Sequence, residues 1–206
     1  MSAFVAAISL TFGGSGQALA QEVSNLPVVQ AVVRTATAVA TPVAATPVIS
    51  TADQAVASEV GVLQRAGWPL YALVDRFSAG APLTDEANCI AVAVYHEARG
   101  ESVEGQLAVA KVIMNRAASG VYPSSWCGVV KQHAQFSFVH NGHFPSVDQS
   151  SDAWRKALGV TRLAVANAVP SVPTSCLWYH ADYVAPSWSS NLTRVDKIGA
   201  HIFYRS

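Results

Sequence analysis

Charged side chains are scarce in this chain, which narrows the kinds of partner it suits. Of its 206 residues, 13% are charged, against about 25% in an average soluble domain. The formal net charge is +0, so the sequence has neither the basic footprint of a nucleic-acid-binding protein nor a polybasic membrane patch. We therefore expect no nucleic-acid partner. We also expect a monomer.

The usual metal-binding motifs are also missing. The chain has no His-Glu-x-x-His segment and no pair of Cys-x-x-Cys segments, which are common zinc-binding patterns. A zinc site built on histidines is an alternative, because the spacing of His140 and His143 is one that metal sites use. We expect no metal and no cofactor. The histidines of that alternative are His133, His140, His143, His180 and His201.

Cysteine is rare as well, with 3 residues at positions 89, 127 and 176. They allow three different single disulfides, and the sequence does not choose among these and three buried thiols. Cys89 begins an apolar helical segment, where the helix dipole can activate a thiolate, so a papain-like pairing with His180 is an alternative. The neighbouring Ile90 and Ala91 favour core packing instead.

The apolar run near the N-terminus is too short for a confident transmembrane helix, which needs about 20 residues. It extends from Phe4 to Phe12, and Ala18-Leu19-Ala20 before Gln21 fits a small-x-small cleavage site. We interpret residues 1–20 as a signal peptide. The protein is then expected to be exported, to the periplasm or the cell envelope.

Two further segments precede the expected folded domain. Residues 21–58 are rich in Ala, Val, Thr and Pro and poor in large apolar groups, so we expect a linker. Residues 59–83 are more apolar and include Trp68 and Phe77, so we expect a short helix that packs on the domain at 84–206.

The pattern of residues 84–206 predicts an α+β domain, with a helical core and a small C-terminal β-hairpin or sheet. Thr84 and Ser102 are suited to cap two helices, one over 85–98 and one that stops near Gly120. The other expected elements are a helical turn at Trp126–Lys131, an extended piece at Gln135–Phe138, a helix over 152–168, a loop at Pro186–Asn191, and strands at Cys176–Tyr179 and Arg194–Tyr204 with a turn at Ile198-Gly199.

Glu97 is the sharpest candidate for chemistry. On a helix it shares one face with Ile90, Ala93 and Val94, so the face that enters the core ends in a carboxylate, and Gly100 marks the helix end. Desolvation there raises the pKa of a carboxyl group, which can then act as a general acid near neutral pH. The alternative is a structural salt bridge from Glu97 to Arg99 or Arg116.

Aromatic and polar side chains in the second half of the chain indicate a carbohydrate site. Aromatic rings stack on sugar rings, while amide and imidazole groups bond sugar hydroxyls and acetamides. Trp188, in a polar loop, is the best aromatic candidate, whereas Phe136, Phe138 and Tyr204 are also compatible with the core. The candidate substrate-binding residues are Gln135, Phe136, Ser137, Tyr179, His180 and Trp188.

Several segments in this order resemble the SleB/CwlJ-type cell wall hydrolase family, the spore-cortex-lytic enzymes and their non-spore relatives. The matching segments are Ala93-Val94-Tyr95-His96-Glu97-Ala98-Arg99-Gly100-Glu101, Gly105-Gln106-Leu107-Ala108-Val109-Ala110, Asn115-Arg116, Tyr122-Pro123, Cys127-Gly128-Val129-Val130, Gln135-Phe136-Ser137-Phe138, Tyr179-His180-Ala181-Asp182-Tyr183-Val184 with Pro186 and Trp188, and Ile198-Gly199-Ala200-His201-Ile202-Phe203-Tyr204.

The resemblance implies a lysozyme-like fold, as in lytic transglycosylases and resuscitation-promoting factors. It implies peptidoglycan as substrate, cleavage of the β-1,4 bond between N-acetylmuramic acid and N-acetylglucosamine, and Glu97 as the catalytic glutamate. Two departures limit it. His140 stands where many non-spore relatives carry Cys, so their disulfide cannot form here. Nothing matches the N-terminal peptidoglycan-binding domain of the spore enzyme, so we do not expect cortex specificity.

A single carboxyl group is sufficient if the sugar supplies its own nucleophile, which favours lytic transglycosylation over the usual two-carboxylate mechanism. Three alternatives remain open. One is muramidase-type hydrolysis, with Glu101 or Asp182 positioning water. The others are an amidase that cuts the muramoyl–alanine bond and a non-catalytic module that binds peptidoglycan.

Overall fold

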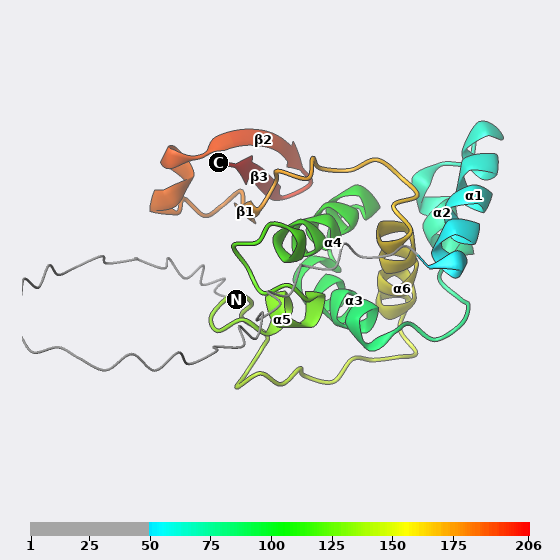
Figure 1. The fold of residues 1–206 in the computed structure, drawn as a ribbon, viewed down its shortest axis with the longest axis horizontal. Helices are drawn as coiled ribbons and strands as arrows, with labels where there is room; N and C mark the ends of the chain where they lie inside the picture. The colour runs from blue at the N-terminus through cyan, green and yellow to red at the C-terminus, as the bar shows by residue number, and fades with distance from the viewer. Residues whose placement is uncertain (1–49) are drawn as a thin grey trace, which may run out of the picture. The chain divides into compact units, whose positions relative to one another are not determined.

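The computed structural model describes residues 50–206. The expected signal peptide at 1–20, and the expected linker up to residue 49, lie outside the described residues. Figure 1 shows the helices gathered on one side and the strands on the other. The described elements are α1 (Thr51–Arg65), α2 (Leu70–Arg76), α3 (Asp85–Ala98), α4 (Val103–Ala118), α5 (Trp126–Lys131), α6 (Asp152–Val165), β1 (Trp178–Ala181), the 3₁₀ helix η1 (Ser187–Asn191), β2 (Thr193–Ile198) and β3 (His201–Arg205).

The helices α3 and α4 begin where their capping residues predict. The Thr84 hydroxyl accepts a hydrogen bond of 3.2 Å from the Ala87 N–H, and the Ser102 hydroxyl accepts one of 3.2 Å from the Gly105 N–H. Each bond satisfies a backbone donor that has no partner inside its helix. The expected helix over 85–98 is confirmed to the residue.

The linker boundary expected at residue 58 is wrong, because residues 51–58 belong to α1. Ser50 and Asp53 form a capping box: the Ser50 hydroxyl accepts from the Asp53 N–H at 3.1 Å, and the Asp53 carboxylate accepts from the Ser50 N–H at 3.2 Å. Val56, Val60 and Leu63 give the helix an apolar side that packs on the core. Cap and apolar face therefore decide the structure of residues that composition assigned to a linker.

The expected packing of residues 59–83 on the domain is confirmed, although it involves parts of two helices. Leu73, Val74 and Phe77 belong to the core. A Cβ atom at Gly159 of α6 would collide with the Val74 carbonyl, so the α2 backbone rests directly on α6. The Arg162 guanidinium of α6 binds the carbonyl oxygens of the segment after α2, namely Phe77, Ser78 and Ala81 at 2.9, 3.2 and 2.8 Å.

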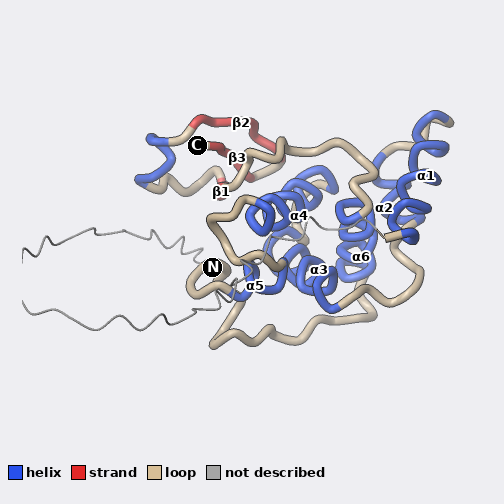
Figure 2. Tube along the Cα trace, in the orientation of Figure 1, coloured by secondary structure: helices blue, strands red, loops and turns tan. Residues whose placement is uncertain are grey.

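The C-terminal strands form one antiparallel sheet in the order β1-β3-β2. Figure 2 shows this sheet, with the short 3₁₀ helix η1 beside it, on one side of the α-helices, of which α4 lies nearest to it. The α+β class with a small C-terminal sheet is therefore confirmed. Gly199, with φ +59°, makes the turn between β2 and β3, close to the turn expected at Ile198-Gly199.

The segment expected to be extended, Gln135–Phe138, is instead a series of turns, so that prediction is wrong. Ala134 has φ +59°, and the Gln135 N–H bonds the Gln132 carbonyl at 3.1 Å. The Phe138 ring stacks on His96 of α3, with 5.0 Å between ring centroids. The contact of Phe138 with α3 and of Phe136 with Phe138 therefore accompanies these turns.

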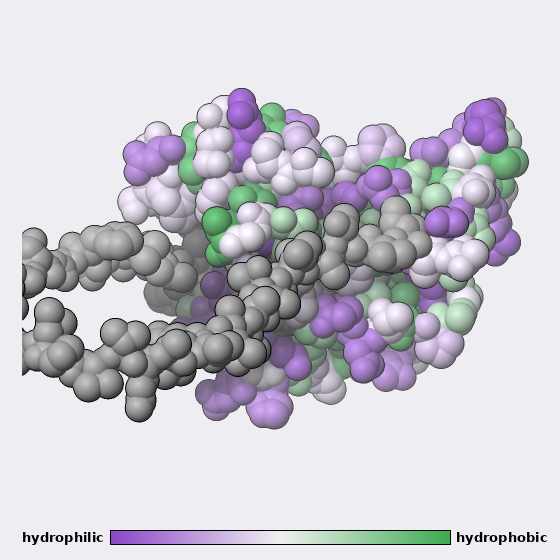
Figure 3. Space-filling view, viewed as in Figure 1, coloured by the Kyte–Doolittle hydropathy of each residue, from purple (hydrophilic) through white to green (hydrophobic). Residues whose placement is uncertain are grey.

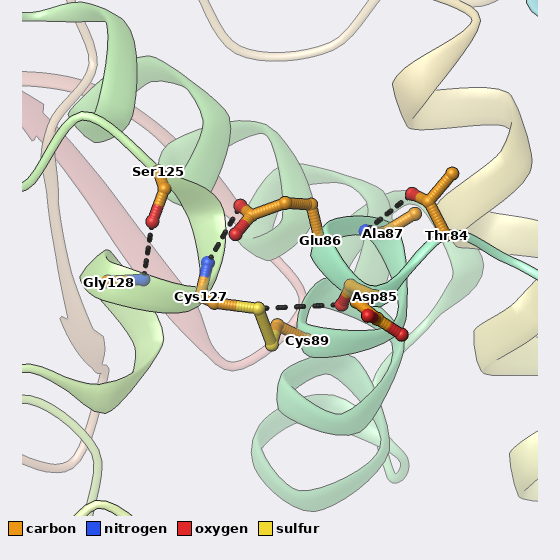
Figure 4. The surroundings of a disulfide bond; sticks show 8 residues. All are labelled: Thr84, Asp85, Glu86, Ala87, Cys89, Ser125, Cys127 and Gly128. Carbon is orange, nitrogen blue, oxygen red and sulfur yellow. Dashed lines mark hydrogen bonds between the residues drawn. A yellow bond between two sulfur atoms is a disulfide. The ribbon is translucent and has the colours of Figure 1, made fainter.

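One disulfide, between Cys89 of α3 and Cys127 of α5, settles the pairing that the sequence left open (Figure 4). The Cys127 N–H also donates to the Glu86 carboxylate at 3.1 Å, so two links join the start of α3 to the start of α5. Cys176 is a buried free thiol, and burial raises its pKa to about 11. The papain-like alternative is excluded for Cys89, whose sulfur is bonded.

The described surface mixes polar and apolar residues, with apolar residues reaching the surface in the region of α1 in Figure 3. Val62, Trp68 and Tyr71 are the large exposed apolar residues of α1, α2 and the turn between them. No helix among residues 50–206 is both long enough and apolar enough to cross a membrane.

Candidate active site

Glu97 lies in the last turn of α3, at the end of the helix face that enters the core. Ile90, Ala93 and Val94 on the same helix are fully buried, whereas the Glu97 side chain is partly buried. The helix ends one residue later, at Ala98. The carboxyl group therefore stands at the edge of the core, as the sequence predicts.

The electrostatic environment of Glu97 favours a retained proton. Burial raises the pKa of its carboxyl group above the ordinary value of 4.5, and the positive charge of Arg116 offsets part of that rise. Within residues 50–206, no Lys, Arg or His nitrogen lies within 4.0 Å of the Glu97 carboxylate, so the salt bridge to Arg99 or Arg116 is not formed. The group is placed to act as an acid.

Arg116 lies on α4, and its side chain is 3% exposed. Its Nε atom donates a hydrogen bond of 2.7 Å to the carbonyl of Leu177, just before β1. The guanidinium carbon lies 5.2 Å from the ring centroid of Tyr122 and 5.9 Å from that of Tyr179. Two aromatic rings and one carbonyl thus hold a buried cation at the junction of α4 and β1.

The neighbouring Asn115 fixes the same junction. Its side-chain amide donates to the carbonyls of Pro173 and Cys176, at 2.8 and 3.0 Å. The Asn115-Arg116 pair therefore clamps the chain that leads into β1. The sequence suggested Arg116 only as a possible salt-bridge partner of Glu97 and suggested no role for Asn115. The sequence pattern that could have indicated this role is two large polar residues that follow the apolar face of a helix.

Among the predicted substrate-binding residues, Tyr179 is the one whose pKa is shifted by the charge of Glu97. Burial raises the pKa of its phenol well above 10.0, the Glu97 charge raises it further, and Arg116 opposes the rise. Its ring also packs edge-on against His201, at 5.2 Å between centroids. The phenol therefore stays neutral and keeps a proton that it can donate in a hydrogen bond.

His180 and Trp188 lie on the other face of the sheet, because successive side chains of a strand point to opposite faces. His180 is 4% exposed, and its Nε2 and Nδ1 atoms lie 2.9 Å from the Tyr204 hydroxyl and the Ala181 carbonyl. Trp188 packs edge-on against both rings. Both ring nitrogens of His180 therefore have partners within the protein and the ring is covered, so substrate binding by His180 stays a prediction. Trp188 is likewise not brought together with Glu97.

The remaining predicted binding residues belong to the turns after α5. Phe136 is 3% exposed and packs in the core, the alternative that the sequence left open, and its role in stacking on a sugar stays a prediction. Gln135 is partly buried and Ser137 is exposed. Ser137 lines a shallow hollow of about 610 Å³ together with His133 and His140, and Glu97 is not among the lining residues. Substrate binding by Gln135 and Ser137 stays a prediction.

Glu101 and Asp182, the two acids considered for positioning water, each have another partner. The Glu101 carboxylate accepts a hydrogen bond of 2.8 Å from the Ala200 N–H and lies 4.0 Å from Nδ1 of His201. Asp182 forms an ion pair of 2.7 Å with Lys197. Among the described residues, no group of three or more His, Cys, Asp and Glu side chains is arranged to hold a metal ion.

These features define a helical domain with a small antiparallel sheet and a partly buried glutamate, Glu97, that lies within electrostatic reach of the buried Arg116. Comparison with known proteins places it in a family. The profile of the cell wall hydrolase family matches residues 100–204, beginning just after Glu97. The chain therefore belongs to the cell wall hydrolase family, and the resemblance seen in the sequence is confirmed.

Two similar curated proteins are spore cortex-lytic enzymes. The chain is 32% identical to that of Bacillus subtilis over 119 residues, which cover 58% of this chain and 37% of that protein. It is also 32% identical to that of Oceanobacillus iheyensis over 122 residues, covering 58% and 41%. The chain thus spans less than half the length of these relatives.

A solved structure is also similar, the catalytic domain of the germination-specific lytic transglycosylase SleB from Bacillus anthracis. The two chains are 29% identical, with a TM-score of 0.50, and the match covers 62% of this chain and 100% of that domain. The expected lysozyme-like fold is therefore confirmed.

Proposed function

We propose that this protein cleaves peptidoglycan between N-acetylmuramic acid and N-acetylglucosamine as a lytic transglycosylase, with Glu97 as the acid and base. Membership of the cell wall hydrolase family supports peptidoglycan as the substrate. The similar domain described as a lytic transglycosylase supports the type of cleavage.

The reaction requires one carboxyl group that works twice. Protonated Glu97 donates to the glycosidic oxygen, the bond from that oxygen to the muramyl C1 breaks, and N-acetylglucosamine leaves with a free 4-hydroxyl. The substrate's own acetamide stabilises the oxocarbenium-like centre. The Glu97 carboxylate then takes the proton of the muramyl 6-hydroxyl, whose oxygen bonds C1. The product is a 1,6-anhydro sugar, Glu97 is protonated again, and no water is consumed.

The observation that carries the proposal is the environment of Glu97. The carboxyl group is partly buried, has no cation within 4.0 Å among the described residues, and has a raised pKa. Hydrolysis with a second acid is less well supported, since Glu101 already binds the Ala200 N–H. Tyr179 is proposed to contact the sugar near Glu97, with Gln135 and Ser137 at the periphery.

The experiment is digestion of purified peptidoglycan, followed by mass spectrometry of the products. Anhydro-muropeptides support the proposal. Reducing muramyl ends would show hydrolysis instead, and free stem peptides would show an amidase. Absence of turnover with retained binding to peptidoglycan would show a non-catalytic module.

Glu97→Gln tests the assigned residue, because glutamine keeps the shape but cannot give up the proton. We expect turnover to fall about 10²-fold or more, with an unchanged circular dichroism spectrum. Glu104→Gln is the matched control, since it removes an exposed carboxylate from the first turn of α4. Near-normal turnover of Glu97→Gln would place the acid elsewhere.

We also propose export to the periplasm or cell envelope, by a monomeric chain without a nucleic-acid partner. The Ala18-Leu19-Ala20 pattern supports removal of a signal peptide before Gln21. The disulfide between Cys89 and Cys127 suits an oxidising compartment. N-terminal mass analysis of the protein recovered from cell fractions tests both cleavage and location.

A further inference from the structure

The buried guanidinium of Arg116 has fewer partners than its burial calls for. A guanidinium carries five N–H donors and stays charged in proteins. Here Nε donates to the Leu177 carbonyl, whereas Nη1 is buried and has no hydrogen-bond partner among the described protein atoms. Buried charges persist in proteins when an opposite charge or a set of hydrogen bonds compensates them.

No carboxylate of residues 50–206 lies within 4.0 Å of Arg116. The guanidinium group contacts the rings of Tyr122 and of Tyr179 in β1. The Cys176 thiol, also close enough to feel its charge, is held neutral by burial. The acidic group within its electrostatic reach is Glu97.

The Arg116 side chain does not move when Glu97 gains or loses its proton, because contacts with the segment before β1 fix its position. The Leu177 carbonyl holds Nε, and the adjacent Asn115 ties α4 to Pro173 and Cys176. The cation is therefore fixed whether or not Glu97 is charged. Fixed charges aimed at the place where opposite charge develops stabilise that charge without reorganisation.

We propose that Arg116 is the fixed counter-charge of Glu97, a positioning residue that stabilises the carboxylate formed each time Glu97 gives up its proton. In the resting state Glu97 is protonated and neutral, whereas Arg116 is charged and its Nη1 atom has no hydrogen-bond partner among the described protein atoms. After proton donation the carboxylate and the guanidinium compensate each other. The role in turnover rests on the proposed function, whereas the charge coupling does not.

The groups around Glu97 that bear on its titration come from three elements. Arg116 on α4 lowers the pKa of Glu97, and Tyr179 on β1 is a neutral phenol coupled to it. On its own helix, Glu97 is followed by the exposed Arg99, and the neighbouring His96 has a pKa lowered first by burial and then by Arg99. Removing Arg116 should therefore raise the pKa of Glu97.

The first test follows the wild-type protein by NMR, without peptidoglycan. We expect the Arg116 side-chain nitrogen signals to shift with pH at the midpoint of the Glu97 carboxyl signal, and this shift to vanish in Glu97→Gln. Arg162, which binds three carbonyls of the segment after α2, is the internal control and should not respond. Arg116 signals that ignore the Glu97 titration would overturn the proposal, whatever the protein's activity.

The second test separates counter-charge from simple clamping. Arg116→Gln removes the charge but keeps an N–H donor for Leu177, and Asn115→Ala loosens the same segment while leaving the charge. We expect Arg116→Gln to move the alkaline limb of the pH–rate profile upward, while Asn115→Ala leaves the limb in place. If both variants fold and the alkaline limbs of their pH–rate profiles lie at the same pH, the proposal is contradicted. Coupled NMR titrations in a protein that cleaves no peptidoglycan would instead support the coupling and refute the proposed function.

Discussion

The carboxylate of Glu101 accepts a hydrogen bond of 2.8 Å from the backbone N–H of Ala200, a residue 99 positions further along the chain. This bond joins the segment between α3 and α4 to the turn between β2 and β3. Gly199 lies against the same oxygen, and a Cβ atom there would collide with it. The helical part and the sheet are thus fastened at a point four residues beyond Glu97.

Loss of this fastening should lower stability. We expect Glu101→Ala to reduce the free energy of unfolding by about 1.5–3 kcal/mol, the usual contribution of a hydrogen bond to a charged group. Urea denaturation monitored by circular dichroism measures it. A loss below about 0.5 kcal/mol, the range of ordinary surface substitutions, would show that the Glu101–Ala200 bond does not hold the sheet.

The collision at Gly199 provides an independent check of the same contact. Gly199 and Gly120 both have positive φ, +59° and +76°, but nothing lies within 4 Å of a Cβ at Gly120. We expect Gly199→Ala to cost more stability than Gly120→Ala, which loses about 1 kcal/mol through its backbone alone. In a Glu101→Ala background the difference should shrink. A difference that persists there would assign the strain to another neighbour.

Glu97 should also make the stability of the fold depend on pH. Between pH 4.5 and the higher pKa of Glu97 in the folded protein, the folded state holds a proton that the unfolded state has released. The free energy of unfolding therefore falls as the pH rises through this window. Glu97→Gln lacks this loss, so its advantage over wild type should grow by about 1.4 kcal/mol for each unit of raised pKa.

Urea denaturation of both proteins at a series of pH values measures this difference. Glu104→Gln, which removes an exposed carboxylate, should run parallel to wild type through the window. A Glu97→Gln curve that also runs parallel to wild type would mean that the Glu97 carboxyl is not desolvated.

Reduction of the disulfide should cost more than any of these substitutions. Cys89 and Cys127 are 38 residues apart, and a closed loop of that size lowers the entropy of the unfolded chain by an amount worth about 4 kcal/mol at 25 °C. We expect reductant to lower the urea midpoint of wild type and of Cys176→Ala alike. A Cys89→Ser/Cys127→Ser double variant should not respond to reductant. A response from that variant would point to Cys176.

The face of the sheet that carries His180 and Tyr204, with Trp188 packed on it, should behave as a packing unit. Tyr204→Phe removes the hydroxyl that lies 2.9 Å from Nε2 of His180, leaving a buried nitrogen without a partner. We expect a loss of about 1–3 kcal/mol in wild type and much less in a His180→Leu background. A double-mutant cycle by urea denaturation measures the coupling. If Tyr204→Phe lost turnover but not stability, His180 would instead be supported as a substrate-binding residue.

The sequence was informative wherever local chemistry decides structure. Thr84 and Ser102 cap their helices as expected, and the position of Glu97 followed from helix periodicity alone. Residues 51–58 were misassigned because composition was weighed above the capping box of Ser50 and Asp53, which is itself visible in the sequence.

The failures arose where distant residues decide the outcome. The segment of Phe136 and Phe138 bends into turns, with Phe138 stacked on His96 of α3 and Phe136 packed against Phe138. The two faces of β1 separate Tyr179 from His180, and the sequence does not tell which face meets the helices. The role of Arg116 depends on the carbonyl of Leu177, 61 residues away, so no local pattern announces it.

The contact of Gly159 with Val74 of α2, together with the full burial of Val60 of α1, makes the first two helices part of the folding unit, although they precede the stretch shared with the family. A chain cut back to residue 84 would leave a strip of bare α6 backbone facing water, together with an Arg162 guanidinium stripped of the carbonyls it binds. A shortened version of this protein that keeps these contacts therefore starts near Ser50, and purification tags or tethers belong ahead of that residue.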